Sequence, residues 1–134
     1  MEMQNRTVLV VDDDDDLRSL MVEMLRAEGY DVVSASDGSS ALDRLAEHPQ
    51  AAVIVLDLTM PGMDGYEFLR RQRADPKIAS IPVVVVTAVT EKPQFVDDVF
   101  AFLKKPVEGG VLLAVVDTAS SGGMGPRPRI RPRE

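Results

Sequence analysis

The chain has 134 residues, of which 45% are apolar but only 4% aromatic, so it has the length of one domain with an aliphatic core. Its net charge of -7 argues against nucleic acid as a direct ligand, because phosphate backbones bind to basic surfaces. Without cysteine, disulfides, thiolate metal sites and thiol redox chemistry are excluded. The first residues lack the features of a signal peptide, and no apolar run approaches the roughly 20 residues of a membrane span. We therefore expect a cytoplasmic protein that does not associate with a membrane.

Apolar runs alternate with amphipathic, helix-length segments along most of the chain. Strands are predicted near 6–11, 31–35, 52–57, 82–87 and 100–103. Helices are predicted near 15–28, near 39–47, after the turn at Asp64-Gly65, and near 107–119. Most strand segments are continuous apolar runs, which is typical of strands covered on both faces, and only 31–35, DVVSA, fits an edge position. This order predicts an α/β domain with a parallel sheet and helices on both of its faces.

Two segments depart from the regular alternation. Pro93 lies in VTEKPQFVDD, between the last two predicted strands, so the fourth helix is predicted to be shortened or distorted. From Ser120 onward the chain is rich in glycine, proline and arginine and has almost nothing apolar to bury. Residues 120–134 are therefore predicted to be a disordered tail after a domain that spans residues 1–119. The tail arginines could bind an anionic partner or stay solvated; they are Arg127, Arg129, Arg131 and Arg133.

Polar side chains follow the apolar runs at the ends of four predicted strands. Asp12 and Asp13 end TVLVVDD, Asp57 ends AAVIVLD, Thr87 ends IPVVVVT, and Lys105 follows VFAFLK. The carboxyl ends of parallel strands meet at one edge of the sheet, where open α/β sheets bind their ligands. These five side chains are therefore predicted to converge.

Carboxylates on neighbouring strands repel one another unless a cation lies between them, and hard oxygen ligands favour Mg²⁺ or Mn²⁺. A divalent cation would also neutralise charge during attack of a carboxylate on phosphorus, for which Asp57 is the natural nucleophile. The Thr87 hydroxyl and the Lys105 ammonium are the donors available to the transferred phosphoryl oxygens. The backbone of Thr59 could contribute a carbonyl to the metal and an amide to the phosphoryl group.

Four motifs in this order, VLVVDD, VIVLDLTMPGMDG, VVVVTA and FLKKP, resemble those of the receiver domain of two-component response regulators. The resemblance covers roughly residues 6–118 and implies a flavodoxin-like, doubly wound sheet of five parallel strands in the order 2-1-3-4-5. It implies a stand-alone, chemotaxis-type switch that takes a phosphoryl group on Asp57 from a histidine kinase or phosphotransfer protein. Phosphorylation would then change its binding to a downstream protein. We expect a monomer that promotes its own phosphorylation and dephosphorylation but turns over no separate substrate.

The resemblance also implies a role for each residue of the metal site. Asp13 matches a direct Mg²⁺ ligand, whereas Asp12 matches an acid that acts mainly through water. Asp57 and the backbone carbonyl of Thr59 complete the protein ligands.

The switch residues of the family likewise have counterparts in this chain. Thr87 matches the hydroxyl that moves onto the phosphoryl group, and Phe102 matches the aromatic side chain that rotates inward behind it. Lys105 matches the lysine that pairs with the phosphoryl group, and the Lys105-Pro106 peptide is implied to be cis.

Some polar residues near these motifs have simpler interpretations. Asp14, Asp15 and Asp16 fall at a helix N-terminus, where acids cap free amides and meet the helix dipole favourably. Lys104 is the better candidate for a surface lysine than its neighbour, because successive strand residues point to opposite sides. We assign no role to His48.

Two other functions remain open. A degenerate receiver could keep the fold as a constitutive protein-interaction module, which the altered fourth helix and a last helix that opens with the poor helix formers Gly109-Gly110 favour. An aspartyl-phosphate phosphatase of the haloacid dehalogenase type also uses a strand-end aspartate with Mg²⁺. That class expects a second acid two residues after the nucleophile, where this chain has Thr59.

Overall fold

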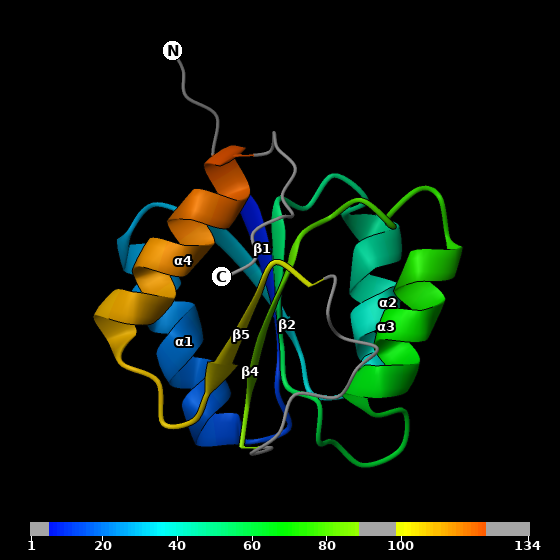
Figure 1. Ribbon diagram of the computed structural model, residues 1–134, viewed down its shortest axis with the longest axis horizontal. Coiled ribbons are helices and arrows are strands. Elements are labelled where there is room, and N and C mark those ends of the chain that lie inside the picture. The colour runs from blue at the N-terminus through cyan, green and yellow to red at the C-terminus, as the bar shows by residue number, and fades with distance from the viewer. Residues whose placement is uncertain (1–5, 89–98, 123–134) are drawn as a thin grey trace.

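The computed structural model describes residues 6–88 and 99–122, in which five strands alternate with helices (Figure 1). The strands are β1 (Thr7–Val11), β2 (Asp31–Ala35), β3 (Val53–Leu56), β4 (Val83–Thr87) and β5 (Ala101–Lys104). The helices are α1 (Asp15–Ala27), α2 (Gly38–Glu47), α3 (Gly65–Ala74) and α4 (Gly109–Gly122). None of the helices in these two ranges has the length and the apolar sequence that a membrane span requires.

All strand pairs are parallel, and the strand order is β2-β1-β3-β4-β5. This order, with helices on both faces, is the flavodoxin-like doubly wound topology, as predicted. The register aligns one residue from each strand in a row near the carboxyl edge: Ala35, Val11, Leu56, Val85 and Phe102. The sheet thus brings the ends of β1 and β3 side by side at its centre.

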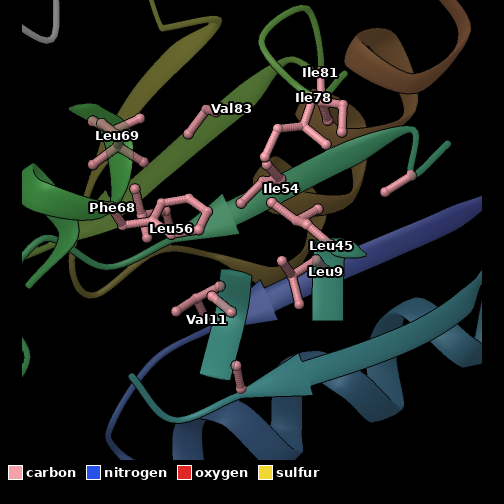
Figure 2. Close-up of a cluster of buried hydrophobic side chains, with 14 of the residues drawn as sticks. Leu9, Val11, Leu45, Ile54, Leu56, Phe68, Leu69, Ile78, Ile81 and Val83 are labelled. Carbon is pink, nitrogen blue, oxygen red and sulfur yellow. The ribbon is translucent and has the colours of Figure 1, made fainter. Parts of the chain in front are cut away.

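The apolar strands build two cores because successive side chains point to opposite faces of the sheet. Helices α2 and α3 cover one face and α1 and α4 cover the other (Figure 1). Figure 2 shows the first core, which includes Leu9, Val11, Ile54, Leu56, Leu45 and Phe68. The second core includes Val8, Val10, Val53, Val55, Met21, Leu25 and Leu112. Burial on both faces explains why the central strands β1, β3 and β4 are almost wholly apolar, whereas the edge strands β2 and β5 are more exposed and carry polar residues.

Three helices begin at an aspartate whose side chain caps the first turn. Asp14 accepts a hydrogen bond from the amide of Leu17 at 3.1 Å, which confirms its interpretation as a capping residue. The caps of α2 and α3 are Asp37 and Asp64. Each cap satisfies an amide that has no partner within its helix. Asp15 and Asp16 lie in the first turn of α1, as expected for acids at the positive end of a helix dipole.

The last helix continues three residues beyond its predicted end. α4 runs to Gly122, so the boundary expected between residues 119 and 120 lies inside the helix. The hydroxyls of Ser120 and Ser121 donate to the carbonyl of Asp117, which extends the final turn. The remaining tail residues, 123–134, and the predicted fourth helix at 89–98 lie outside the described residues.

Candidate functional site

The two central strands deliver carboxylates to the carboxyl edge of the sheet. Asp12 follows β1 and Asp57 follows β3. The amide of Asp57 donates to the carbonyl of Val11 at 3.0 Å, and the amide of Asp12 donates to Ala35 at 3.1 Å. The hydrogen-bond ladder therefore extends one residue past the strands. These backbone hydrogen bonds alone place the two aspartates beside each other, independently of any side-chain contact.

Asp12, Asp13 and Asp57 form a carboxylate cluster. One oxygen from each lies within 4.8 Å of the other two. The side chains of Asp12 and Asp57 are buried, with residue exposures of 1% and 4%, whereas Asp13 is exposed. Oδ2 of Asp12 is buried and has no hydrogen-bond partner of good geometry within the described ranges. This set of close carboxylate oxygens fits a hard divalent cation such as Mg²⁺.

Lys105 supplies the positive charge at this edge. Its ammonium lies 3.0 Å from Oδ2 of Asp12 and 3.1 Å from Oδ2 of Asp57. The amide of Lys105 donates to the carbonyl of Thr87 at 2.9 Å, which ties the end of β5 to the end of β4. Its neighbour Lys104 is exposed, as interpreted from the sequence. The Lys105-Pro106 peptide is cis, which confirms the expectation drawn from the family.

Burial and pairing oppose each other in the protonation of this cluster. Burial raises the pKa of Asp12, and the Asp14 amide and Lys105 only partly offset it. For Lys105, burial acts to lower the pKa, but the contacts with Asp12 and Asp57 outweigh it and leave the pKa above its ordinary value. The lysine is therefore held in its charged form, while the charged form of Asp12 is less favourable than that of a solvent-exposed aspartate.

Backbone amides hold the other two carboxylate oxygens. Oδ1 of Asp12 accepts from the amide of Asp14 at 2.9 Å, and Oδ1 of Asp57 accepts from the amide of Thr59 at 3.2 Å. The Thr59 amide, which we expected to serve a phosphoryl group, thus bonds the nucleophile itself in this structure. Both contacts orient a carboxylate by local hydrogen bonds.

The loop after Asp57 is held against the start of α3. The amide of Gly65 donates to the carbonyl of Leu58 at 3.0 Å. A Cβ atom at Gly65 would lie 2.5 Å from the carbonyl oxygen of Asp57 and 2.6 Å from Cα of Leu58. Only glycine permits this close approach. The sequence indicated a turn at Gly65, but the contact with the backbone of Asp57 is evident only in the fold.

The two predicted switch residues lie at the ends of the outer strands. Thr87 ends β4 and is completely buried. Phe102 lies on β5, is partly buried, and packs against the core beneath α2 and α3. Both positions agree with the locations that the motifs predicted for them. Their movement on phosphorylation stays a prediction.

Arg18 is a site neighbour that sequence reasoning missed. Its Nη1 donates to the backbone carbonyl of Asp12 at 2.7 Å, and its Nη2 pairs with Asp15 at 2.7 Å. The contact with Asp15 is an i, i+3 pair and could be anticipated from helical spacing. The contact with Asp12 depends on how α1 packs on the sheet, for which the local sequence carries no signal.

Comparison with known proteins identifies the family. Residues 8–117 match the model of the response regulator receiver domain. Response regulator PleD of Caulobacter vibrioides is 37% identical over 113 residues, which cover 81% of this chain and 25% of PleD. DNA-binding response regulator MtrA of Mycolicibacterium smegmatis is 38% identical over 91 residues, covering 68% of this chain and 38% of MtrA. The chain thus spans well under half the length of these relatives.

Solved structures give the same result. A response regulator receiver protein from Pseudomonas putida is 30% identical, with a TM-score of 0.80, covering 87% of this chain and 99% of that one. Chemotaxis response regulator CheY4 of Vibrio cholerae is 28% identical, with a TM-score of 0.77 and the same coverage. The chain belongs to the receiver domain family of the response regulators of two-component signal transduction.

Proposed function

We propose that this chain is a phosphorylation switch that accepts a phosphoryl group on Asp57 in a Mg²⁺-dependent reaction. The observation that carries the proposal is that the buried carboxylates of Asp12 and Asp57 both lie within hydrogen-bond distance of the Lys105 ammonium, at 3.0 and 3.1 Å. Two buried carboxylates next to one lysine form an arrangement that packing alone does not favour. The family supports the same function, because receiver domains act as phosphoacceptors.

Each residue then has a defined task. An oxygen of Asp57 forms the new bond to phosphorus, while the bond from phosphorus to the donor's imidazole nitrogen breaks and its electron pair returns to that nitrogen. Lys105, already paired with the Asp57 carboxylate, stays beside the phosphoryl oxygens and offsets their charge. Asp12, Asp13, Asp57 and the Thr59 carbonyl would hold the cation. When bound, it would neutralise charge on the carboxylates and on the incoming group.

The partners follow from this chemistry and the surface. We propose a histidine kinase or a phosphotransfer protein as the donor, and a protein as the downstream target. We also propose a cytoplasmic monomer without turnover of a separate substrate. With a net charge of -7, direct binding of nucleic acid or of a membrane surface is not part of the proposal.

Intact-mass spectrometry after incubation with acetyl phosphate and Mg²⁺ tests the proposal. We expect a gain of one phosphoryl group that the variant Asp57→Asn and a chelator both abolish, whereas Asp16→Asn, which changes another acid nearby, keeps it. A folded protein that gains no mass would favour the degenerate receiver. Sustained release of phosphate from an aryl phosphate would instead favour the phosphatase.

A further inference from the structure

A polar cavity of about 300 Å³ lies at the carboxyl end of β2. Six polar residues from α1, β2 with its following loop, and α2 line it: Arg18, Ser34, Ser36, Ser40, Asp43 and Arg44. Because β2 is the neighbour of β1 in the sheet, the cavity lies beside the strand that Asp12 follows. Two arginines and three serine hydroxyls are a donor-rich lining in a chain that is acidic overall.

Arg44 has a donor without an acceptor. Its Nε is buried and has no hydrogen-bond partner within the described ranges. Its Nη2 pairs with Glu47 at 3.3 Å, which is long for a hydrogen bond to a carboxylate. Buried donors in folded proteins are nearly always satisfied by protein, water or a ligand. An oxygen bound at this guanidinium would supply the missing acceptor.

The ion pairs that now hold both arginines are easily replaced. Arg18 pairs with Asp15 and Arg44 pairs with Glu47, in both cases three residues apart on one helix, and the side chains of the two acids are 82% and 55% exposed. Such surface pairs contribute little to stability, because water and salt screen them. A ligand with strong acceptors could therefore recruit the guanidinium groups at little cost.

We propose that this cavity binds a small phosphate monoester. A carboxylate offers only two oxygens, whereas the terminal oxygens of a phosphate group can use both arginine forks and the serine hydroxyls. The cavity has a volume at the lower end of the range for small-molecule sites, so it holds more than a bare phosphate ion. Asp43 in the lining can accept from a hydroxyl or an amino group on the rest of the molecule.

Arg18 links this cavity to the carboxylate cluster. The same guanidinium lines the cavity and donates to the backbone carbonyl of Asp12. A bound phosphate group that attracts Arg18 changes this contact and with it the start of the Asp12–Asp14 turn. Occupancy of the cavity and the state of the cluster are therefore coupled. Binding itself does not depend on phosphorylation of Asp57.

An NMR titration of amide shifts of the full chain tests the proposal, in metal-free buffer without carboxylate and at constant ionic strength. The probes are inorganic phosphate and glycerol 3-phosphate. We expect saturable shifts at Ser34, Ser36, Ser40 and Asp12, with tighter binding of the ester. Arg44→Gln should weaken binding about tenfold or more, the loss expected for a charge-assisted hydrogen bond. Arg44→Lys keeps the charge but not the two-pronged guanidinium, so its affinity should lie between those of the wild type and Arg44→Gln.

Arg70→Gln is the control, because Arg70 also pairs with a glutamate three residues away, on another helix and outside the cavity lining. It should leave the affinity unchanged. Asp43→Asn should reduce the preference for the ester. Shifts that do not saturate, that are confined to Thr59 and Lys105, or that are equal in Arg44→Gln and wild type would overturn the proposal. Equal affinity for the two probes would overturn the assignment of a monoester.

Discussion

The apolar faces of the sheet and its carboxyl edge consist of consecutive residues of the same strands, yet they follow different rules. Val11 and Leu56 pack beneath helices, and the very next residues, Asp12 and Asp57, are almost equally buried but carry charge. Burial of apolar area stabilises a fold, whereas burial of a carboxylate costs free energy unless a cation compensates it. The carboxyl edge therefore lacks the stabilisation that the apolar faces provide, which is typical of a functional site.

The largest effect is expected on the apolar face. Leu45→Ala removes a side chain that is 1% exposed in the core shown in Figure 2, and should lower the free energy of unfolding by about 3 kcal/mol. Leu20→Ala, at a position that is 53% exposed, should change it by less than about 1 kcal/mol. Urea unfolding measures both. Equal losses would show that burial does not govern how much these apolar side chains contribute to stability.

Removal of the Lys105 ammonium should have the next largest effect on the free energy of unfolding. Lys105→Met leaves two buried carboxylates without their partner, and we expect a loss of about 2 kcal/mol in metal-free buffer. Lys104→Met changes the exposed neighbour on the same strand and should be close to neutral. Mg²⁺ should restore part of the loss in Lys105→Met. If both variants unfold at the same urea concentration, the lysine does not compensate the carboxylates.

Neutralising one buried carboxylate should stabilise the fold instead of destabilising it. Asp12→Asn removes a charge that burial disfavours, while its Oδ1 can still accept from the Asp14 amide. We expect the variant to be more stable than wild type by about 1 kcal/mol without metal. Addition of Mg²⁺ should narrow the difference, since the wild type then gains a counter-ion. If Asp12→Asn is less stable than the wild type in metal-free buffer, the buried charge of Asp12 does not lower the stability of the fold.

The smallest effect concerns charges that lie outside both regions. Hydrogen bonds from Arg70 and Arg71 lower the pKa of Glu67 from its ordinary value to about 2. Because the pKa in the folded chain is lower, this contribution to stability is present above about pH 4.5 and is lost as the pH falls towards about 2. NMR titration of the Glu67 carboxyl should show the low midpoint. Arg70→Gln should raise it, and Lys77→Gln should not.

The sequence predicts most of the fold because the central strands are apolar on both faces and the strands are separated by helix-length segments. It predicts the convergence of Asp12, Asp57 and Lys105 because each follows a strand, and parallel strands share one carboxyl edge. Contacts that depend on helix packing were missed, as for Arg18 on the carbonyl of Asp12. The sequence also does not predict that α4 extends to Gly122. Serine hydroxyls can bond to the backbone in helical and in non-helical conformations, so Ser120 and Ser121 do not by themselves indicate a helix.

Thermal unfolding in increasing MgCl₂ at constant ionic strength tests the central claim most directly. The unfolding midpoint of the wild type should rise with Mg²⁺, as for any ligand that binds the folded state alone. Asp13→Asn should abolish most of that rise, whereas Asp16→Asn, a nearby acid in the first turn of α1, should retain it. No rise in the wild type, or the same rise in all three proteins, would contradict the claim that this edge is a cation-dependent phosphorylation site.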